Sequence, residues 1–169
     1  MIGNDVIDLQ QSRQESNWQR KGFIEKLFTT NEQSLIAEDS NPEMMVWLLW
    51  SMKEAAYKIH NRKTKIREYI PQKLNCSFIS GNKNTIVMGE VFCSGNIYHT
   101  KTMLSEEIIY TIAATSINDL ENAIEIENKG IFKDENGIPY LLDSVSNTFQ
   151  AVSISHHGRF EKVVAVNNQ

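Results

Sequence analysis

The chain of 169 residues is 41% hydrophobic and 22% charged, which predicts one domain, or one domain with a tail, and excludes wholesale disorder or a fibrous architecture. No apolar run approaches the roughly 18 residues of a membrane helix, and the sequence shows neither signal-peptide features nor a Cys-x-x-Cys pair, so we expect a cytoplasmic protein with reduced thiols and no membrane partner. The net charge of −4 argues against nucleic acid as a partner.

The first part of the chain is predicted to be mostly helical after one short strand. Residues 2–9 are apolar and favour a strand, and residues 10–28 carry spaced apolar positions that indicate a weak helix. Thr29 and Glu32 have the spacing of a capping box, which predicts the start of a further helix. The strongest helical pattern runs from residue 43 to about residue 61, without an internal glycine or proline.

The remainder of the chain changes to short strands separated by turns. The predicted strands are residues 74–80, 85–93, 97–103 and 108–114, then, after a polar bridge at 115–123, residues 124–132, 140–142, 151–155 and 160–166. The two hairpins at 97–115 and 149–166 are loosely alike, which hints at an internal duplication. Helices followed by strands predict an α+β fold with helices packed on an antiparallel sheet.

A local excess of positive charge stands out in this acidic chain. Residues 53–67 carry six cations against the single acid Glu54: Lys53, Lys58, Arg62, Lys63, Lys65 and Arg67. Such a segment can attract an anionic ligand. The alternative is a solvated helix end whose cations suit the negative pole of the helix dipole.

Two groups of charged residues could carry chemistry. Asp5 and Asp8 lie at the end of a predicted strand, where carboxylates can meet a divalent cation, and Glu54 and Lys58 are four residues apart on one helix face. The ordinary interpretation of that pair is a surface ion pair worth a few tenths of a kcal/mol. However, the run Trp47–Trp50 predicts a largely buried helix, where a charged pair needs partners or shifts its pKa. The residues alone permit a metal-assisted, phosphate-handling site without requiring one.

Two adjacent histidines lie near a predicted hairpin turn. His156 and His157 would point to opposite faces of a strand, so they make a poor chelating pair. Histidines at turns are mostly surface residues. We expect replacement of His157 to have little effect.

Taken in chain order, several segments resemble the 4′-phosphopantetheinyl transferase superfamily. Gly3-Asn4-Asp5 resembles its Gly-x-Asp opening, and Phe28–Glu32 is similar to its Phe-Ser/Thr-x-x-Glu helix start. Trp50–Lys58 resembles the Trp-x-x-Lys-Glu-Ala-x-x-Lys signature and is the most specific match. Asn136–Tyr140 and Ser153–His156 resemble Gly-Lys-Pro and Ile-Ser-His elements, which precede the Gly-x-Asp motif in two-lobed members of the family.

The resemblance implies the family's α+β fold as a lobe over residues 1–115 with a shorter, strand-rich lobe over 116–169 that completes the coenzyme A site. Such a chain would be a reduced pseudo-dimer. In single-lobed members the chain order matches this one and the sites form between subunits. Completion of the pocket within one chain, or by a neighbouring chain in a homo-oligomer, therefore stays open.

The activity that the resemblance implies is transfer of 4′-phosphopantetheine from coenzyme A to a serine of an acyl or peptidyl carrier protein, with release of 3′,5′-ADP, in fatty-acid or secondary-metabolite biosynthesis. It implies Mg²⁺ held by Asp5 and Glu54, and catalysis by these two carboxylates together with Lys58. The contacts that it implies for coenzyme A are Lys53, Lys58, Arg62 and His156.

Two departures from the family pattern leave alternatives open. Ile7 stands where two-lobed members often have a third metal-binding carboxylate, and Ile138 replaces the lysine of Gly-Lys-Pro. One alternative is a non-catalytic module that binds coenzyme A or a carrier protein. The other is an unrelated metal-dependent phosphoesterase that uses Asp5 and Glu54 and needs no carrier protein.

Overall fold

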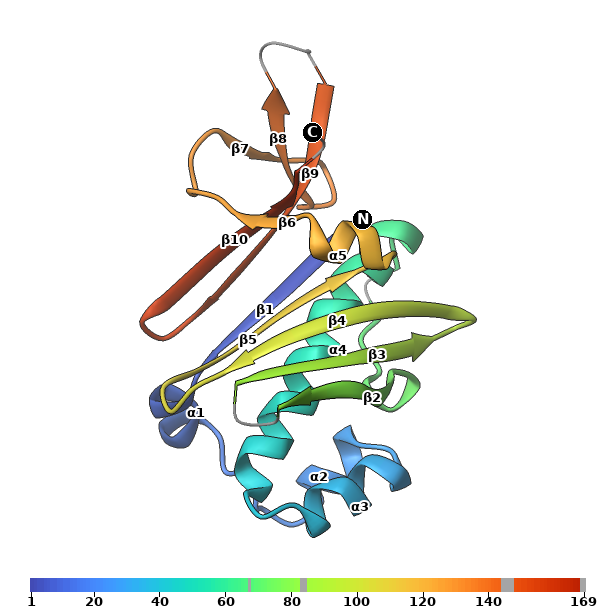
Figure 1. Ribbon diagram of the computed structural model, residues 1–169, viewed down its shortest axis with the longest axis vertical. Helices are drawn as coiled ribbons and strands as arrows, with labels where there is room; N and C mark the ends of the chain where they lie inside the picture. The colour runs from blue at the N-terminus through green and yellow to red at the C-terminus, as the bar shows by residue number, and fades with distance from the viewer. Residues whose placement is uncertain (67, 83–84, 144–147, 168–169) are drawn as a thin grey trace.

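Two antiparallel sheets and a set of helices make up the computed structural model, which describes residues 1–66, 68–82, 85–143 and 148–167 (Figure 1). The first sheet has the strand order β1-β5-β4-β3-β2. Its strands are β1 (Ile2–Asp8), β2 (Asn75–Asn82), β3 (Ile86–Cys93), β4 (Asn96–Leu104) and β5 (Ile108–Ala114). The second sheet has the order β6-β10-β9-β8-β7. Its strands are β6 (Ala123–Glu125), β7 (Ile131–Lys133), β8 (Pro139–Asp143), β9 (Thr148–His157) and β10 (Phe160–Val166).

The two sheets repeat one topology. In each sheet the first strand of the chain pairs with the fifth, and the fourth, third and second follow in that order. The alike hairpins predicted at 97–115 and 149–166 are β4–β5 and β9–β10, which occupy equivalent places in the two sheets. The second sheet lacks the helices that connect the first two strands of the first sheet. This arrangement is that of a reduced pseudo-dimer, and the predicted α+β class is confirmed.

Most of the helices lie between β1 and β2. They are α1 (Leu9–Glu15), α2 (Phe23–Leu27), α3 (Thr30–Glu38) and α4 (Pro42–Thr64), followed by a 3₁₀ turn (Pro71–Lys73). The capping box predicted at Thr29 is formed: the Thr29 hydroxyl accepts from the Glu32 N–H, and the Glu32 carboxylate accepts from the Thr29 N–H. The Asn41 side chain caps α4, and a left-handed Lys65 (φ 61°) ends it.

Three segments differ from the prediction. The weak helical pattern of residues 10–28 is divided into α1 and α2 by a turn that ends at Gly22, whose φ is 82°. The polar bridge contains a short helix, α5 (Ile117–Glu121), capped by Ser116. The strand predicted at 124–132 is two strands, β6 and β7, with Gly130 (φ 68°) between them. Arg67, in the basic segment, lies outside the described residues.

The main core lies between α4 and one face of the first sheet, across which α4 runs in Figure 1. Its fully buried members include Leu49, Met52 and Ile59 on α4. At Gly3, β1 passes so close to α4 that a Cβ atom would lie 2.2 Å from the Ala55 carbonyl oxygen. Only glycine permits this approach, and it brings the next residues of β1 against the same helix face.

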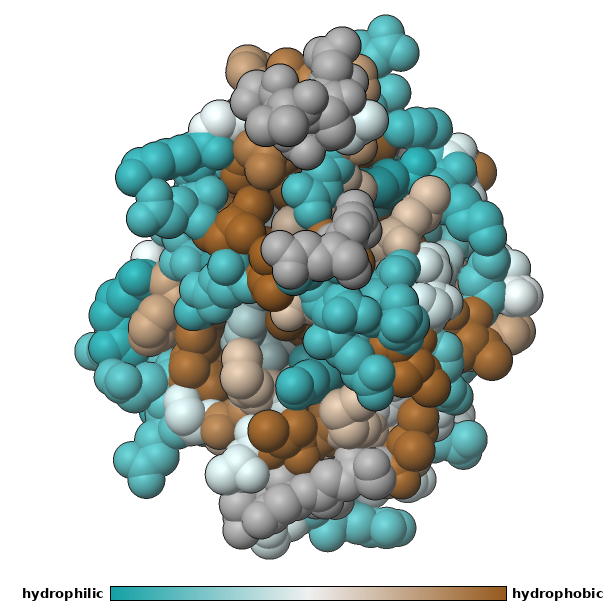
Figure 2. Space-filling model, turned by 45° about the horizontal axis from the view of Figure 1, so that its top comes forward, coloured by the Kyte–Doolittle hydropathy of each residue, from teal (hydrophilic) through white to brown (hydrophobic). Residues whose placement is uncertain are grey.

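The second sheet packs against β1 at one end of the molecule and has a much smaller core (Figure 1). The buried members of that core are Val152, Val163 and Ala165. On the face drawn in Figure 2, hydrophobic residues form separate patches among hydrophilic side chains. Within the described residues, no helix is both long and apolar enough to cross a bilayer.

Candidate active site

Asp5, Glu54 and Lys58 come together where β1 crosses α4. Side chains alternate along a strand, so Asp5 lies on the same face of β1 as Gly3, which contacts α4 at Ala55. Glu54 and Lys58 occupy successive turns of that helix. Asp5 and Glu54 both line a cavity of about 400 Å³, whose walls include Trp47 and Trp50. The structure thus brings together the three residues predicted to be catalytic.

Burial strongly perturbs the three charges. Burial, followed by the negative charge of Asp5, raises the pKa of Glu54 to about 7. Burial also raises the pKa of Asp5, against the opposing effect of the Lys58 charge. Desolvation lowers the pKa of Lys58, while the two carboxylates act to raise it. Two partly desolvated carboxylates therefore share one nearby cation.

The carboxylate pair fits a divalent cation. The Oδ1 atom of Asp5 accepts a hydrogen bond of 3.2 Å from the Ser155 hydroxyl, whereas Oδ2 is buried and has no hydrogen-bond partner among the described residues. Buried carboxylate oxygens are normally paired or bound to metal. A hard cation beside Asp5 and Glu54 would relieve the repulsion that raises the Glu54 pKa. Among the described residues, no group of three or more His, Cys, Asp or Glu side chains is placed to hold a metal ion.

The strand β9 closes this site from the second sheet. Its alternate side chains satisfy the N–H groups on the free edge of β1: the Ser153 hydroxyl accepts from Asn4 at 3.1 Å, the Ser155 hydroxyl accepts from Val6 at 3.0 Å, and His157 Nδ1 accepts from Asp8 at 2.9 Å. We call these three side chains the β9 ladder. It replaces the main-chain hydrogen bonds that a neighbouring strand would supply.

Two cations of α4 bind main-chain carbonyl groups of β1 and of the second sheet. The ammonium group of Lys58 donates to the carbonyls of Asn4 (2.7 Å) and Ile154 (3.1 Å). The guanidinium of Arg62 donates to the carbonyls of Val152 and Pro139. Residues of both sheets therefore contact these two side chains of α4.

A second cavity of about 330 Å³ adjoins the first. It is lined by Lys58 and Arg62 from α4, by His156, and by the turn between β7 and β8 that includes Gly137 and Ile138. His156 is exposed and lines both cavities. Three of the four residues predicted to contact coenzyme A therefore meet around one hollow.

Lys53, the fourth of these residues, lies elsewhere. Its ammonium group is fully buried and pairs with Glu32 at 2.7 Å, where it also donates to the carbonyls of Leu27, Pro71 and Leu74. The structure does not bring it to either cavity. Its contacts connect α3, α4 and the 3₁₀ turn, which is a structural role.

Two residues beside Asp5 on the chain also have structural roles: Asp8, the second carboxylate of the strand, and Ile7, at the position of the third metal-binding carboxylate of two-lobed members. The Asp8 carboxylate caps α1 and forms a bidentate pair with Arg159 at 2.8 and 3.0 Å. The Arg159 guanidinium holds the Asp8 pKa below its usual range. Ile7 is buried in the main core. Neither residue adds a ligand beside Asp5.

The sequence did not identify several residues around the carboxylates. Ser51, one turn before Glu54, acts to lower the Asp5 pKa. The Tyr69 hydroxyl acts to lower the Glu54 pKa, although its geometry falls short of a hydrogen bond. His157, expected to be dispensable, belongs to the β9 ladder and contacts Glu15 at 3.3 Å. The alternation Ser-x-Ser-x-His was the available signal, because residues two apart on a strand share a face.

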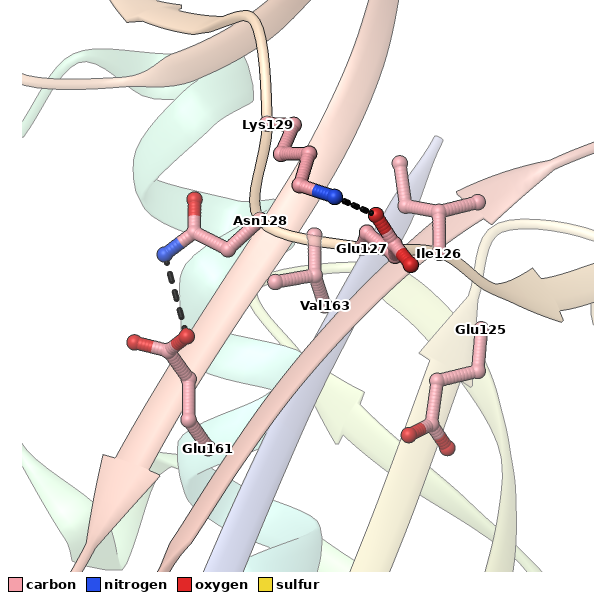
Figure 3. A pocket seen from close by; sticks show the side chains of 7 residues that line it. All are labelled: Glu125, Ile126, Glu127, Asn128, Lys129, Glu161 and Val163. Atoms are coloured by element: carbon pink, nitrogen blue, oxygen red, sulfur yellow. Dashed lines mark hydrogen bonds and ion pairs between the residues drawn. The ribbon is translucent and has the colours of Figure 1, made fainter.

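Another hollow, on the second sheet, has a different character (Figure 3). Its volume is about 600 Å³, and its lining includes the carboxylates of Glu125, Glu127 and Glu161. Lys129 pairs with Glu127 at 2.5 Å, and Asn128 donates to Glu161 at 3.1 Å. The acidic lining would repel a polyanionic ligand, so this hollow does not compete with the site at β1 and α4.

A match to one protein-family model agrees with the motifs on β1 and α4. The family model of the 4′-phosphopantetheinyl transferase superfamily matches residues 1–111, which include both Asp5 and the whole of α4. The crystal structure of Thermotoga maritima holo-[acyl-carrier-protein] synthase is similar with a TM-score of 0.45 and 12% identity, over 99% of this chain and 83% of that one. No curated protein is significantly similar in sequence. On the match to the family model, the chain belongs to the 4′-phosphopantetheinyl transferase superfamily.

Proposed function

We propose that this chain transfers 4′-phosphopantetheine from coenzyme A to a serine hydroxyl of an acyl or peptidyl carrier protein and releases 3′,5′-ADP. The observation that carries the proposal is the partly buried pair of Asp5 and Glu54 beside Lys58 and a cavity lined by cations. Among the described residues, Oδ2 of Asp5 has no hydrogen-bond partner. Family membership supports the reaction class.

In the proposed reaction, the carrier serine oxygen bonds to the phosphorus atom of phosphopantetheine, and the bond from that phosphorus to the bridging oxygen of 3′,5′-ADP breaks. Glu54 is the carboxylate that would accept the serine proton, and its pKa of about 7 is that of the site without a bound cation. Lys58 holds two carbonyls with two of its three N–H donors. The third donor is taken up by no described residue and can stabilise negative charge on a phosphate oxygen.

Asp5 and Glu54 would hold Mg²⁺ with their carboxylate oxygens, and a bound Mg²⁺ neutralises charge on the phosphates. Arg62 and His156 would contact the diphosphate or adjacent groups of coenzyme A in the second cavity. The two cavities meet at His156, so one extended anionic ligand can occupy both. For Lys53, the buried pair with Glu32 supports positioning of α4 rather than contact with coenzyme A.

The proposal is tested by following 3′,5′-ADP release chromatographically with coenzyme A, Mg²⁺ and an apo carrier protein. We expect release that requires the carrier protein and falls by orders of magnitude in Asp5→Ala and Lys58→Ala, with Lys63→Ala on the same helix as the control. Coenzyme A binding without release would indicate a non-catalytic module. Hydrolysis of simple phosphate esters without a carrier protein would indicate a phosphoesterase.

A further inference from the structure

Among the described residues, Ser155 is the one member of the β9 ladder that donates a hydrogen bond to a carboxylate of the proposed site. All three ladder residues accept a hydrogen bond from β1. Ser153 contacts only the Asn4 N–H in this way, whereas Ser155 also contacts Oδ1 of Asp5 at 3.2 Å. Ser155 is 6% exposed, so water cannot readily replace its hydroxyl.

The donor and acceptor groups present determine the direction of both Ser155 hydrogen bonds. A backbone N–H can only donate, so the Ser155 oxygen accepts from Val6 at 3.0 Å. The single hydroxyl hydrogen is then available for Asp5 Oδ1. This bond occupies one oxygen of the Asp5 carboxylate, and the buried Oδ2 has no hydrogen-bond partner among the described residues. The second sheet therefore contributes to the orientation of the carboxylate, on which the Ser51 hydroxyl of α4 also acts.

We propose that Ser155 is a positioning residue that orients Asp5 for cation binding, so that the cation site is assembled only when β9 docks on the edge of β1. The inference rests on the proposed function, because it takes Asp5 and Glu54 as the metal ligands. It adds a residue outside the matched region 1–111 to the requirements of the site. Residues that orient metal ligands through hydrogen bonds commonly change metal affinity by about 10- to 100-fold when removed.

The test measures Mn²⁺ affinity of the full chain by electron paramagnetic resonance of free Mn²⁺, without coenzyme A or a carrier protein. We expect Ser155→Ala to weaken Mn²⁺ binding by about tenfold or more. The matched control is Ser153→Ala, which removes an equivalent acceptor for a β1 N–H but no contact with Asp5. It should leave Mn²⁺ affinity within about twofold of the wild type.

A second pair of variants separates orientation from folding. Thr and Val have nearly the same shape, so Ser155→Thr and Ser155→Val differ mainly in the hydroxyl, and only Ser155→Thr should keep Mn²⁺ affinity near that of the wild type. The proposal would be overturned if Ser155→Thr and Ser155→Val bound Mn²⁺ with equal affinity, or if Ser155→Ala kept the wild-type affinity. It would also be overturned if Ser153→Ala lost as much Mn²⁺ affinity as Ser155→Ala, or if the wild type bound no Mn²⁺. Loss of Mn²⁺ affinity as expected, with no transfer to any carrier protein, would instead reject the proposed function and retain the role of Ser155.

Discussion

Glu54 links protonation to stability as well as to the proposed chemistry. Its pKa is about 7 in the folded chain and 4.5 as the ordinary value, so the folded state binds this proton more tightly than the unfolded state. The protonated Glu54 carboxyl therefore makes its full contribution to the free energy of unfolding below pH 4.5, and this contribution is lost as the pH rises through about 7. From about 1.4 kcal/mol per pKa unit, the loss is on the order of 3 kcal/mol.

We predict that Glu54→Gln folds, removes this pH dependence and abolishes transfer. Urea unfolding of the metal-free proteins from pH 4.5 to pH 8 measures the first effect, and the slope against pH should be flatter in the variant. Mg²⁺ should raise the unfolding midpoint of the wild type and leave that of the variant unchanged. An identical pH slope in both proteins would mean that Glu54 does not titrate in this range.

Lys53 belongs to the fold, so its replacement should reduce stability. Removing one partner of a buried ion pair leaves the other charge uncompensated, and Lys53→Met should lower the free energy of unfolding by about 3–5 kcal/mol. Lys63→Met, on the exposed part of α4, should change it by less than about 0.5 kcal/mol. Denaturant unfolding measures both. If Lys53→Met had normal stability but no longer bound coenzyme A, Lys53 would be a coenzyme A contact, as the motif predicts.

Sequence reasoning at the residue scale located Asp5, Glu54 and Lys58 but not their neighbours. Asp5 belongs to the Gly-x-Asp motif, and Glu54 and Lys58 belong to the signature on α4, where they lie one turn apart. The partner of Lys53 depends on how α3 packs on α4, which spacing along the chain does not reveal. Ser155 reaches Asp5 across the whole length of the chain.

Among the elements, β9 carries the side chains of the β9 ladder, which reach β1 from the second sheet. His157 accepts the Asp8 N–H, so His157→Ala leaves a part-buried donor unsatisfied. We predict a loss of stability of about 1–3 kcal/mol for His157→Ala, measured by thermal or urea unfolding. His156→Ala, at the exposed neighbouring position, should keep stability and weaken coenzyme A binding. If His156→Ala lost stability and His157→Ala lost coenzyme A binding instead, then His156 and not His157 would be the residue that faces β1.

The close approach of β1 to α4 is the second determinant at this scale. In Gly3→Ala, the added Cβ would meet the Ala55 carbonyl at 2.2 Å, so the strand and helix must separate. We predict a destabilisation of about 1–3 kcal/mol together with weaker Mn²⁺ binding. Gly95→Ala, in an exposed turn with φ 78° and no atom within 4 Å of the added Cβ, should lower stability without affecting Mn²⁺ affinity.

Long periodic elements were predictable from the sequence, and short ones were less so. The helix predicted from residue 43 to about residue 61 is α4, Pro42–Thr64, and the strand predicted at 160–166 is β10, Phe160–Val166. The division of residues 10–28 and 124–132 depends on glycine turns with positive φ at Gly22 and Gly130. Glycine adopts both signs of φ, so its presence alone does not say which it takes.

In the whole molecule, two sheets of the same topology differ in the helices, the core and the site residues that they contribute. The first sheet has the helices and the main core, and the second supplies β9, the loop at Gly137 and part of each cavity. The family motifs predicted the two lobes. The Ser-x-Ser-x-His alternation indicates only that three side chains of β9 share a strand face. It does not reveal that they dock on main-chain groups of β1, because those contacts join segments at opposite ends of the chain.

The central claim is that this assembly modifies a carrier protein. Intact-protein mass spectrometry of an apo carrier protein, incubated with this chain, coenzyme A and Mg²⁺, tests it most directly. We predict a mass gain of one phosphopantetheine group on the carrier protein, lost when EDTA is added and absent with Glu54→Gln. No mass gain with several carrier proteins, while coenzyme A binding is measurable, would contradict the proposed transfer.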